Sequence, residues 1–181
     1  GSGIPVGLSH ENIKRIWITS FLSAFYVFPL LKSPTGGRRM IRKMKLTDLD
    51  KVMDIWLFSN IQAHDFIPEE YWRSNWQQVR SMLPEAEVYV YEKDDDIRGF
   101  IGMMENYIAG IFVDEKFRSC GIGRELLDYA KSVKKELSLS VYKKNQAVAR
   151  FYLRNGFEIS SEAEDEATGE IEMLMRWKND E

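Results

Sequence analysis

The sequence predicts a mixed α/β domain whose sheet contains antiparallel hairpins. Three observations predict it: β-branched and aromatic runs alternate with segments of helical apolar spacing, short polar turns join several of these runs, and the strict βαβ repeat of a doubly wound sheet is absent. The chain has 181 residues, of which 44% are hydrophobic, so it is long enough for one domain with a buried core.

The first part of the chain, residues 1–39, differs from the rest. Residues 1–3 (Gly-Ser-Gly) resemble a tag scar, and residues 16–31 are mostly apolar. That apolar stretch is shorter than the roughly 20 residues of a membrane-spanning helix, so we expect no stable membrane insertion. Three interpretations stay open: a non-native leader or upstream segment, a native helix that packs on the domain, or membrane contact. The folded domain is expected over residues 40–178.

The first half of this domain is expected to contain one strand followed by two helices. Residues 40–45 are predicted to form the strand. Thr47 and Asp50 have the spacing of a capping box, and apolar residues recur behind them at helical spacing as far as Ile61. Pro68 suits the first turn of a second helix, which Pro84 should end.

The rest of the domain is expected to hold most of the sheet. The three Asp residues at 94–96 predict a turn between two strands, and Thr168-Gly169 predicts another. Between these turns, the acidic run at 162–166 is expected to be a solvated loop. The predicted strands are residues 88–92, 97–104, 107–113, 137–141, 157–160 and 171–177, and the predicted helices are residues 121–135 and 146–155.

The composition excludes several classes of function. The net charge of -3 and pI of 5.6 argue against a nucleic-acid partner, which requires a basic face. A single cysteine, Cys120, excludes an internal disulfide and a CxxC site, and two histidines exclude an HExxH site. We therefore expect no metal, and a reducing cytoplasmic compartment is the simplest interpretation.

One strand–loop–helix junction, residues 111–124, has the composition of an anion site. Gly121 and Gly123 stand at the start of an amphipathic helix, where glycine lets the backbone approach a ligand closely. Unpaired amides at a helix start bind anions, and a pyrophosphate is the natural ligand. Arg118 and Arg124 can add charge-assisted contacts. The alternative is a tight turn with capping glycines.

A second segment follows at residues 145–157. Asn145 can cap a short helix, and Tyr152 lies two turns along the same helix on nearly the same face. Gly156 is suited to end this helix before the next strand. The alternative is that the aromatic residues belong to the core and that Asn145 is an ordinary cap.

Together these two segments resemble the GNAT superfamily of N-acetyltransferases. Arg118-x-x-Gly121-x-Gly123 resembles its pyrophosphate-binding signature, and the segment from Asn145 to Phe157 resembles its second conserved block. The resemblance covers residues 40–178. It implies a central, mostly antiparallel, twisted sheet flanked by about four helices, with acetyl-CoA as co-substrate. Within the superfamily, the chain most resembles small bacterial acetyltransferases of the YjaB type, through residues 63–66, residues 83–86 and Cys120.

The resemblance assigns roles to particular residues. The pantetheine arm should pair with one strand, the pyrophosphate should bind the following turn, and Asn145 should hydrogen-bond near the thiol. Tyr152 occupies the general-acid position, where it would stabilise the leaving thiolate. The residues implied to bind acetyl-CoA are Ile111, Phe112, Val113, Arg118, Ser119, Cys120, Gly121, Ile122, Gly123, Arg124, Asn145 and Tyr152.

The general base is left open by the sequence. Some members of the superfamily carry a glutamate five residues before the asparagine, but here that residue is Ser140. Glu105 is one replacement, and the alternative for it is a solvated strand end. His64 is another, because histidine titrates near neutral pH and this family usually binds the acceptor between the first two helices. The alternative for His64 is a structural hydrogen bond. The expected catalytic residues are thus Tyr152, Asn145, Glu105 and His64.

Two functions follow from the resemblance. The favoured one is transfer of an acetyl group from acetyl-CoA to a primary amine of a small molecule or peptide, by direct attack through a tetrahedral intermediate. The alternative is a catalytically weak module of the same fold that senses acetyl-CoA or binds another protein. A monomer or a homodimer is expected.

Overall fold

The computed structural model of the chain describes residues 37–166 and 168–179. The expectations for the apolar stretch at 16–31 and for the rest of residues 1–36 lie outside these residues. The described part has the predicted order β-α-α-β-β-β-α-β-α-β-β. Its first strand begins at Arg39.

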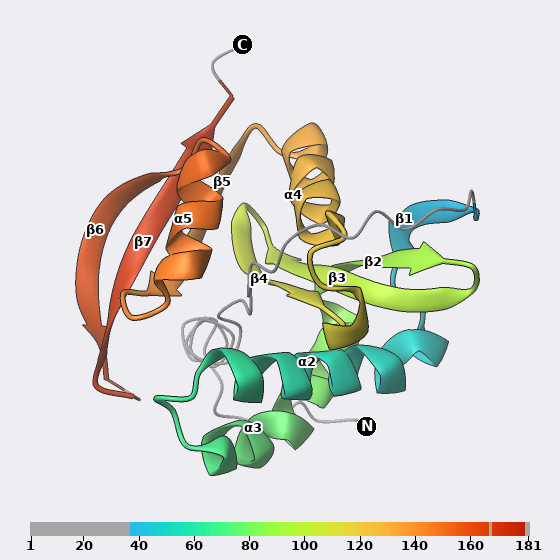
Figure 1. Cartoon of the computed structure of the whole chain (residues 1–181), viewed down its shortest axis with the longest axis horizontal. Coiled ribbons are helices and arrows are strands. Elements are labelled where there is room, and N and C mark those ends of the chain that lie inside the picture. The colour runs from blue at the N-terminus through green and yellow to red at the C-terminus, as the bar shows by residue number, and fades with distance from the viewer. Residues whose placement is uncertain (1–36, 167, 180–181) are drawn as a thin grey trace, which may run out of the picture.

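The described strands form one sheet of seven in the order β1-β2-β3-β4-β5-β7-β6 (Figure 1). Every neighbouring pair in it is antiparallel except β4 and β5, which are parallel. The sheet is therefore mostly antiparallel, as predicted. The strands are β1 (Arg39–Lys43), β2 (Glu87–Lys93), β3 (Asp96–Met104), β4 (Tyr107–Val113), β5 (Glu136–Tyr142), β6 (Glu158–Asp165) and β7 (Glu170–Lys178).

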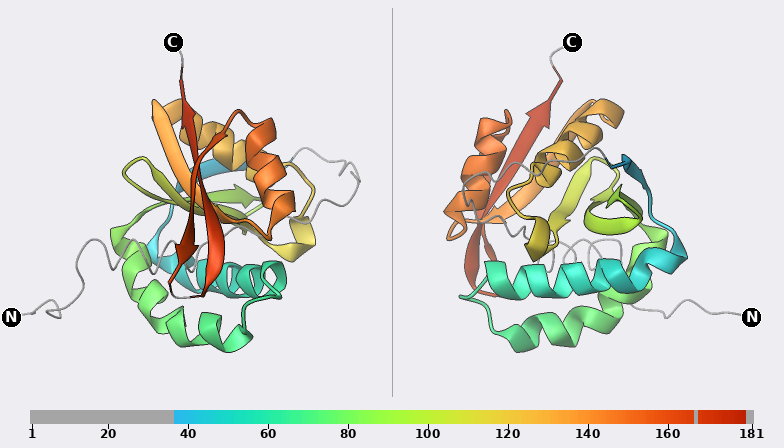
Figure 2. Two further views of the ribbon diagram at one scale, coloured as in Figure 1. Left: turned by 90° about the vertical axis from the view of Figure 1, so that its left-hand side faces the viewer. Right: turned by 45° about the vertical axis from the view of Figure 1, so that its right-hand side comes forward.

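Four α-helices cover the two faces of the sheet in the described part of the chain. Helices α2 (Leu49–Ala63) and α3 (Glu69–Met82) lie on one face, and α4 (Ile122–Val133) and α5 (Gln146–Arg154) lie on the other (Figure 2). The connections contain three short 3-10 helices, η1 (Leu46–Asp48), η2 (Leu83–Glu85) and η3 (Glu115–Phe117). This arrangement gives the domain a separate hydrophobic core on each face.

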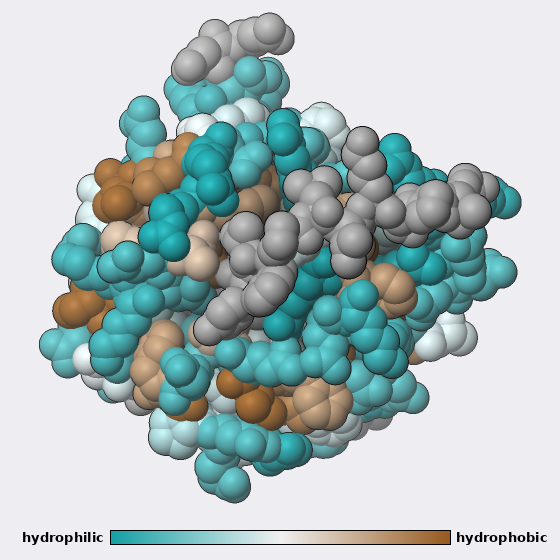
Figure 3. All heavy atoms as spheres, viewed as in Figure 1, coloured by the Kyte–Doolittle hydropathy of each residue, from teal (hydrophilic) through white to brown (hydrophobic). Residues whose placement is uncertain are grey.

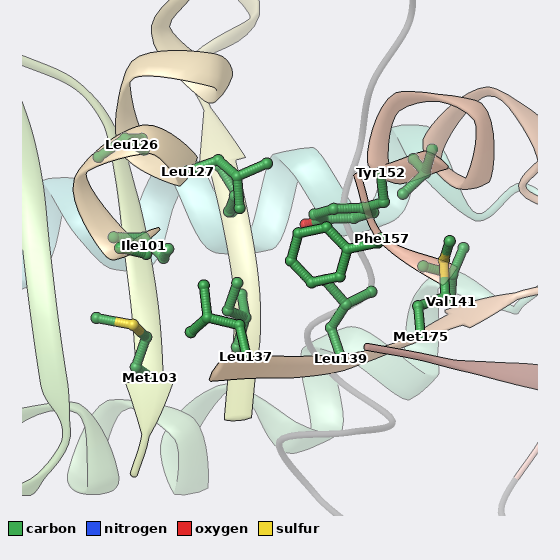
Figure 4. Close-up of a cluster of buried hydrophobic side chains, with 14 of the residues drawn as sticks. Ile101, Met103, Leu126, Leu127, Leu137, Leu139, Val141, Tyr152, Phe157 and Met175 are labelled. Carbon is green, nitrogen blue, oxygen red and sulfur yellow. The ribbon is translucent and has the colours of Figure 1, made fainter. Parts of the chain in front are cut away.

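The two cores differ in composition. The core under α2 and α3 is rich in large aromatic residues, among them Trp56, Trp72 and Phe112. The core under α4 and α5 is mainly aliphatic, and Figure 4 shows leucines of α4 and β5 pointing toward one another there. On the face shown in Figure 3, the described surface is mostly hydrophilic, with hydrophobic residues in small separate groups.

Two local predictions are wrong. Thr47 does not cap α2, because it lies inside η1, and the carboxylate of Asp48 accepts the Lys45 amide at 2.7 Å and the Arg42 guanidinium at 2.7 Å. The acidic run at 162–166 is not a loop, because its first four residues belong to β6. Strand β6 is exposed at every residue except Asp165, so it lacks the apolar alternation that identifies a strand.

Candidate active site

Strands β4 and β5 diverge, and this divergence creates the site. In the described residues, the parallel pairing of these strands consists of one residue pair, Tyr107 with Ser138, at the start of β4. Toward Val113 the opposite edge of β4 still pairs with β3, while the edge that faces β5 continues without a ladder. An extended ligand can pair with such an edge as an additional strand.

The turn into α4 lies just beyond the end of β4. Gly121 has a φ of 82° and precedes the helix, whose N-terminus is capped by no side chain among the described residues. A Cβ added to Gly121 would meet no atom of the described residues within 4 Å. The turn therefore leaves room for a ligand in front of the first amides of α4, where the helix dipole favours an anion. This geometry fits the pyrophosphate predicted at residues 119–124.

The arginines of the motif point elsewhere. The Arg118 guanidinium donates to the side-chain oxygen of Gln62 at 2.6 Å, which connects the turn to α2. Burial lowers the pKa of Arg118. Arg124 is largely exposed and forms an ion pair with Asp128 at 3.7 Å, and Cys120 is also exposed. The main chain, more than these side chains, faces the anion site.

Helix α5 holds the two residues of the second motif. The Asn145 side chain caps this helix by accepting the Val148 amide at 3.4 Å. Tyr152 is 1% exposed, and its ring packs against Phe157 with centroids 5.3 Å apart. Figure 4 shows its oxygen directed away from α5, toward the side on which β4 and α4 lie. Burial, with a smaller contribution from Tyr152, raises the pKa of Tyr107 at the start of β4.

Glu105, the first of the two expected bases, is not brought to this point. Glu105 is exposed in the β3–β4 turn with a φ of 55°, at the end of β4 where the two strands are still paired. Six residues of β4 separate that end from Val113, a length of about 20 Å.

His64, the other expected base, is 0% exposed. Its Nδ1 lies 3.1 Å from the Asn60 carbonyl oxygen, and its ring lies 5.2 Å from that of Trp72. Burial lowers the pKa of His64 to about 4, so it is neutral at pH 7 and shielded from solvent. We therefore assign the general base to neither Glu105 nor His64.

The structure adds a polar cluster that the sequence did not reveal. On the face of α2 and α3, the Tyr142 hydroxyl donates to Asp165 at 2.9 Å, and the Thr168 hydroxyl donates to the same carboxylate oxygen at 2.7 Å. Glu172 stands opposite Tyr142 in the β5–β7 register, and burial raises the pKa of Glu172 to about 7. The sequence marks Glu172 only as an acidic residue in a strand, and its orientation depends on the sheet register.

Comparison with known proteins gives the same fold. A family model described as an acetyltransferase (GNAT) domain matches residues 84–159. Peptidyl-lysine N-acetyltransferase YiaC of Escherichia coli is 35% identical over 140 residues, which are 76% of this chain and 96% of YiaC. Peptidyl-lysine N-acetyltransferase YjaB of the same organism is 32% identical over 137 residues, which are 75% of this chain and 92% of YjaB.

Two solved structures are also similar. The solution structure of apo YjaB from Escherichia coli has a TM-score of 0.70 and 28% identity, and the match covers 78% of this chain and 99% of YjaB. The PaiA N-acetyltransferase of Thermoplasma acidophilum, solved with coenzyme A, has a TM-score of 0.68 and 22% identity, with coverage of 78% and 99%. The second likeness concerns the fold alone.

The fold and these similarities define an acyltransferase that uses an acyl-CoA thioester. More narrowly, the chain belongs to the GNAT family of N-acetyltransferases, and its co-substrate is acetyl-CoA. Within residues 37–166 and 168–179, no helix is long and apolar enough to cross a membrane. The same residues contain no group of three or more His, Cys, Asp or Glu side chains suited to a metal ion.

Proposed function

We propose that the chain acetylates the side-chain amine of lysine in peptides or proteins, by direct attack of the amine on acetyl-CoA. The names of YiaC and YjaB as peptidyl-lysine N-acetyltransferases support this acceptor, because both match over nearly their whole length. The observation that carries the proposal is the divergence of β4 and β5 beside the N-terminus of α4, which no described side chain caps. A cytoplasmic location and a monomeric or homodimeric state remain expectations.

The binding of acetyl-CoA is assigned mainly to the main chain. The amides of residues 119–124 would hold the pyrophosphate at the start of α4. The edge of β4 that faces β5, at Ile111, Phe112 and Val113, would pair with the pantetheine arm. Asn145 would stand near the thiol end, since it begins the helix that carries Tyr152. Acetyl-CoA supplies the activated acetyl group, and the protein fixes its orientation.

The reaction requires two further contributions from the protein. A main-chain amide near Val113 would stabilise the oxyanion of the tetrahedral intermediate. Tyr152 would hydrogen-bond to the departing thiolate. A free tyrosine has a pKa of about 10 and a thiol about 8.5, so full proton transfer to the thiolate is uphill by about 2 kcal/mol. Tyr152 is therefore best described as a thiolate stabiliser that can donate its proton.

The test is a thiol-release assay with acetyl-CoA and three acceptors: the peptide acetyl-Gly-Lys-Gly-amide, a peptide with a free N-terminus and no lysine, and spermidine. We expect release that depends on the lysine peptide, together with a mass increase of one acetyl group on its side chain. Calorimetry in parallel reports binding of acetyl-CoA. Binding without acceptor-dependent release would contradict the proposed activity and favour the sensor module.

A further inference from the structure

Glu172 is a partly buried carboxylate that the mechanism above does not use. It lies on β7 and faces the side of α2 and α3, because its neighbour Met173 belongs to the opposite core. Its Oε1 atom is buried and has no hydrogen-bond partner among the described residues. A buried acceptor without a partner is costly, so its retention calls for an explanation.

The strand register places Glu172 beside the β4–β5 divergence. Tyr107 pairs with Ser138 at the start of β4, and Glu172 stands opposite Tyr142, four residues further along β5, where no pairing with β4 remains among the described residues. Burial raises the pKa of the Tyr107 hydroxyl, and the Glu172 carboxylate adds to this rise. Tyr152 approaches the β4–β5 divergence from the α5 face, whereas Glu172 approaches it from the face of α2 and α3. An amine that enters from this second face would meet Glu172 before it meets the acetyl group.

The groups around Glu172 favour the arrival of a cation. Asp165 from β6 adds a second carboxylate, and burial together with Asp165 raises the pKa of Glu172 to about 7. Tyr107 from β4 and Tyr142 from β5 are kept neutral by burial, which raises both pKa values. Behind Tyr142 lie the neutral His64 and, from α3, Tyr71. No basic side chain in the described residues contributes to the pKa of Glu172.

We propose that Glu172 is the general base of the reaction, and that it receives the acceptor as an ammonium and removes one of its protons. This inference rests on the proposed function, since it requires an amine acceptor. A base poised near the working pH transfers protons efficiently, and a carboxylate in this position also attracts the charged amine.

The proton balance is complete. The Glu172 carboxylate takes one proton from the ammonium and frees the nitrogen lone pair. The N–C bond then forms and the C–S bond breaks, with the electron pair moving to sulfur. A second amine proton reaches the thiolate through the Tyr152 hydroxyl, which gives its own proton and is reprotonated. Glu172 returns its proton to solvent, and the products are the acetyl amide, coenzyme A and one proton.

The test compares Glu172→Gln with the matched control Glu164→Gln, which removes an exposed carboxylate from β6. With acetyl-Gly-Lys-Gly-amide at pH 7.5, Glu172→Gln should lower kcat/KM by about 100-fold, the contribution typical of a general base. Acetyl-CoA affinity should stay within about two-fold. The control should match the wild type in both measurements.

The pH profile separates a base from a structural residue. The wild-type kcat/KM should rise through an inflection near pH 7, which is absent in Glu172→Gln. The variant should instead gain about ten-fold per pH unit until the amine deprotonates in solution near pH 10. Equal activity of variant and wild type at pH 7.5 would overturn the inference, and so would a loss that is constant across pH.

Thermal unfolding supplies a readout that does not depend on activity. Because ionisation of Glu172 is unfavourable in the fold, Glu172→Gln should unfold at a higher temperature than wild type at pH 8 and at a similar temperature at pH 5. If the wild type acetylates no amine, the proposed function fails. The comparison of unfolding temperatures then decides by itself whether ionisation of Glu172 is unfavourable in the fold. Equal midpoints at both pH values would overturn the inference.

Discussion

The two faces of the sheet differ in residue composition and in the function we assign to each. On the face of α4 and α5, the core is mainly aliphatic, and the groups assigned to acetyl-CoA are mostly main-chain amides and carbonyls. On the face of α2 and α3, the core is aromatic and encloses polar side chains, including His64, Asn60 and Asp165. Under the two proposals above, the first face holds one constant ligand and the second receives a charged acceptor.

The difference between a main-chain site and a side-chain site determines how a substitution affects function. A main-chain site needs only the local conformation of one turn, so substitutions there act through the backbone. A side-chain site needs several elements in register, so substitutions there act through charge and hydrogen bonding. Substitutions on the two faces should therefore have different consequences.

The largest effect is expected at Gly121. Gly121→Val places a β-branched residue at a φ of 82° and puts its side chain into the space reserved for the pyrophosphate. We expect acetyl-CoA affinity to fall by at least about 100-fold in calorimetry, because the amides lose access to the anion. The control is Gly169→Val, at a φ of 71° in the β6–β7 turn, which carries a similar backbone cost. Equal affinities in the two variants would contradict the main-chain site.

Tyr152 is expected to affect turnover and leave binding unchanged. Tyr152→Phe removes the hydroxyl that would stabilise the thiolate, so kcat should fall by about 100-fold while the Kd for acetyl-CoA stays within about two-fold. Steady-state kinetics with the lysine peptide measures both. Tyr89→Phe is the control, since its hydroxyl contacts Glu87 at 3.2 Å and its ring packs on Tyr129, neither of which is assigned to acetyl-CoA. An unchanged kcat in Tyr152→Phe would remove this residue from the mechanism.

His64 should make the free energy of unfolding decrease at acidic pH. Burial lowers the pKa of His64 from 6.5 to about 4. As the pH falls, His64 is therefore protonated in the unfolded chain before it is protonated in the folded protein. Stability is therefore complete above pH 6.5 and is lost as the pH falls toward 4, by about 2 kcal/mol between pH 7 and pH 5.

Urea unfolding at both pH values should show this loss in wild type relative to His64→Phe, which has no group to titrate. The comparison between the two proteins removes the effect of other groups, among them Glu172, whose raised pKa acts in the opposite direction. The same pH dependence in both proteins would contradict the buried, neutral state of His64.

The smallest effect is expected at Tyr142. Tyr142→Phe removes one hydrogen bond to Asp165, which keeps its bond from Thr168. The expected loss is about 1 kcal/mol of unfolding free energy, the usual value for one such bond. Differential scanning calorimetry measures it, with Tyr129→Phe on α4 as the control. A loss above about 3 kcal/mol would show that the polar cluster acts as one unit and not as separate bonds.

The element order and the glycine turn were predictable because their signals are local. Apolar spacing identifies α2 and α4, and the two glycines mark the turn at which α4 begins, where the structure gives Gly121 a φ of 82°. The end of β6 was missed, because a strand exposed on both sides carries no apolar alternation. The surroundings of His64 were missed for another reason: its aromatic neighbours come from α3 and β5, which no local pattern connects.

The central claim is that main-chain amides at the start of α4 hold the pyrophosphate of acetyl-CoA. Amide hydrogen exchange with and without acetyl-CoA tests it directly. We predict slower exchange in residues 111–113 and 119–126 with the ligand, and unchanged exchange in β2 at residues 87–93. If calorimetry shows that acetyl-CoA binds while exchange in residues 119–126 stays the same, the claim is contradicted.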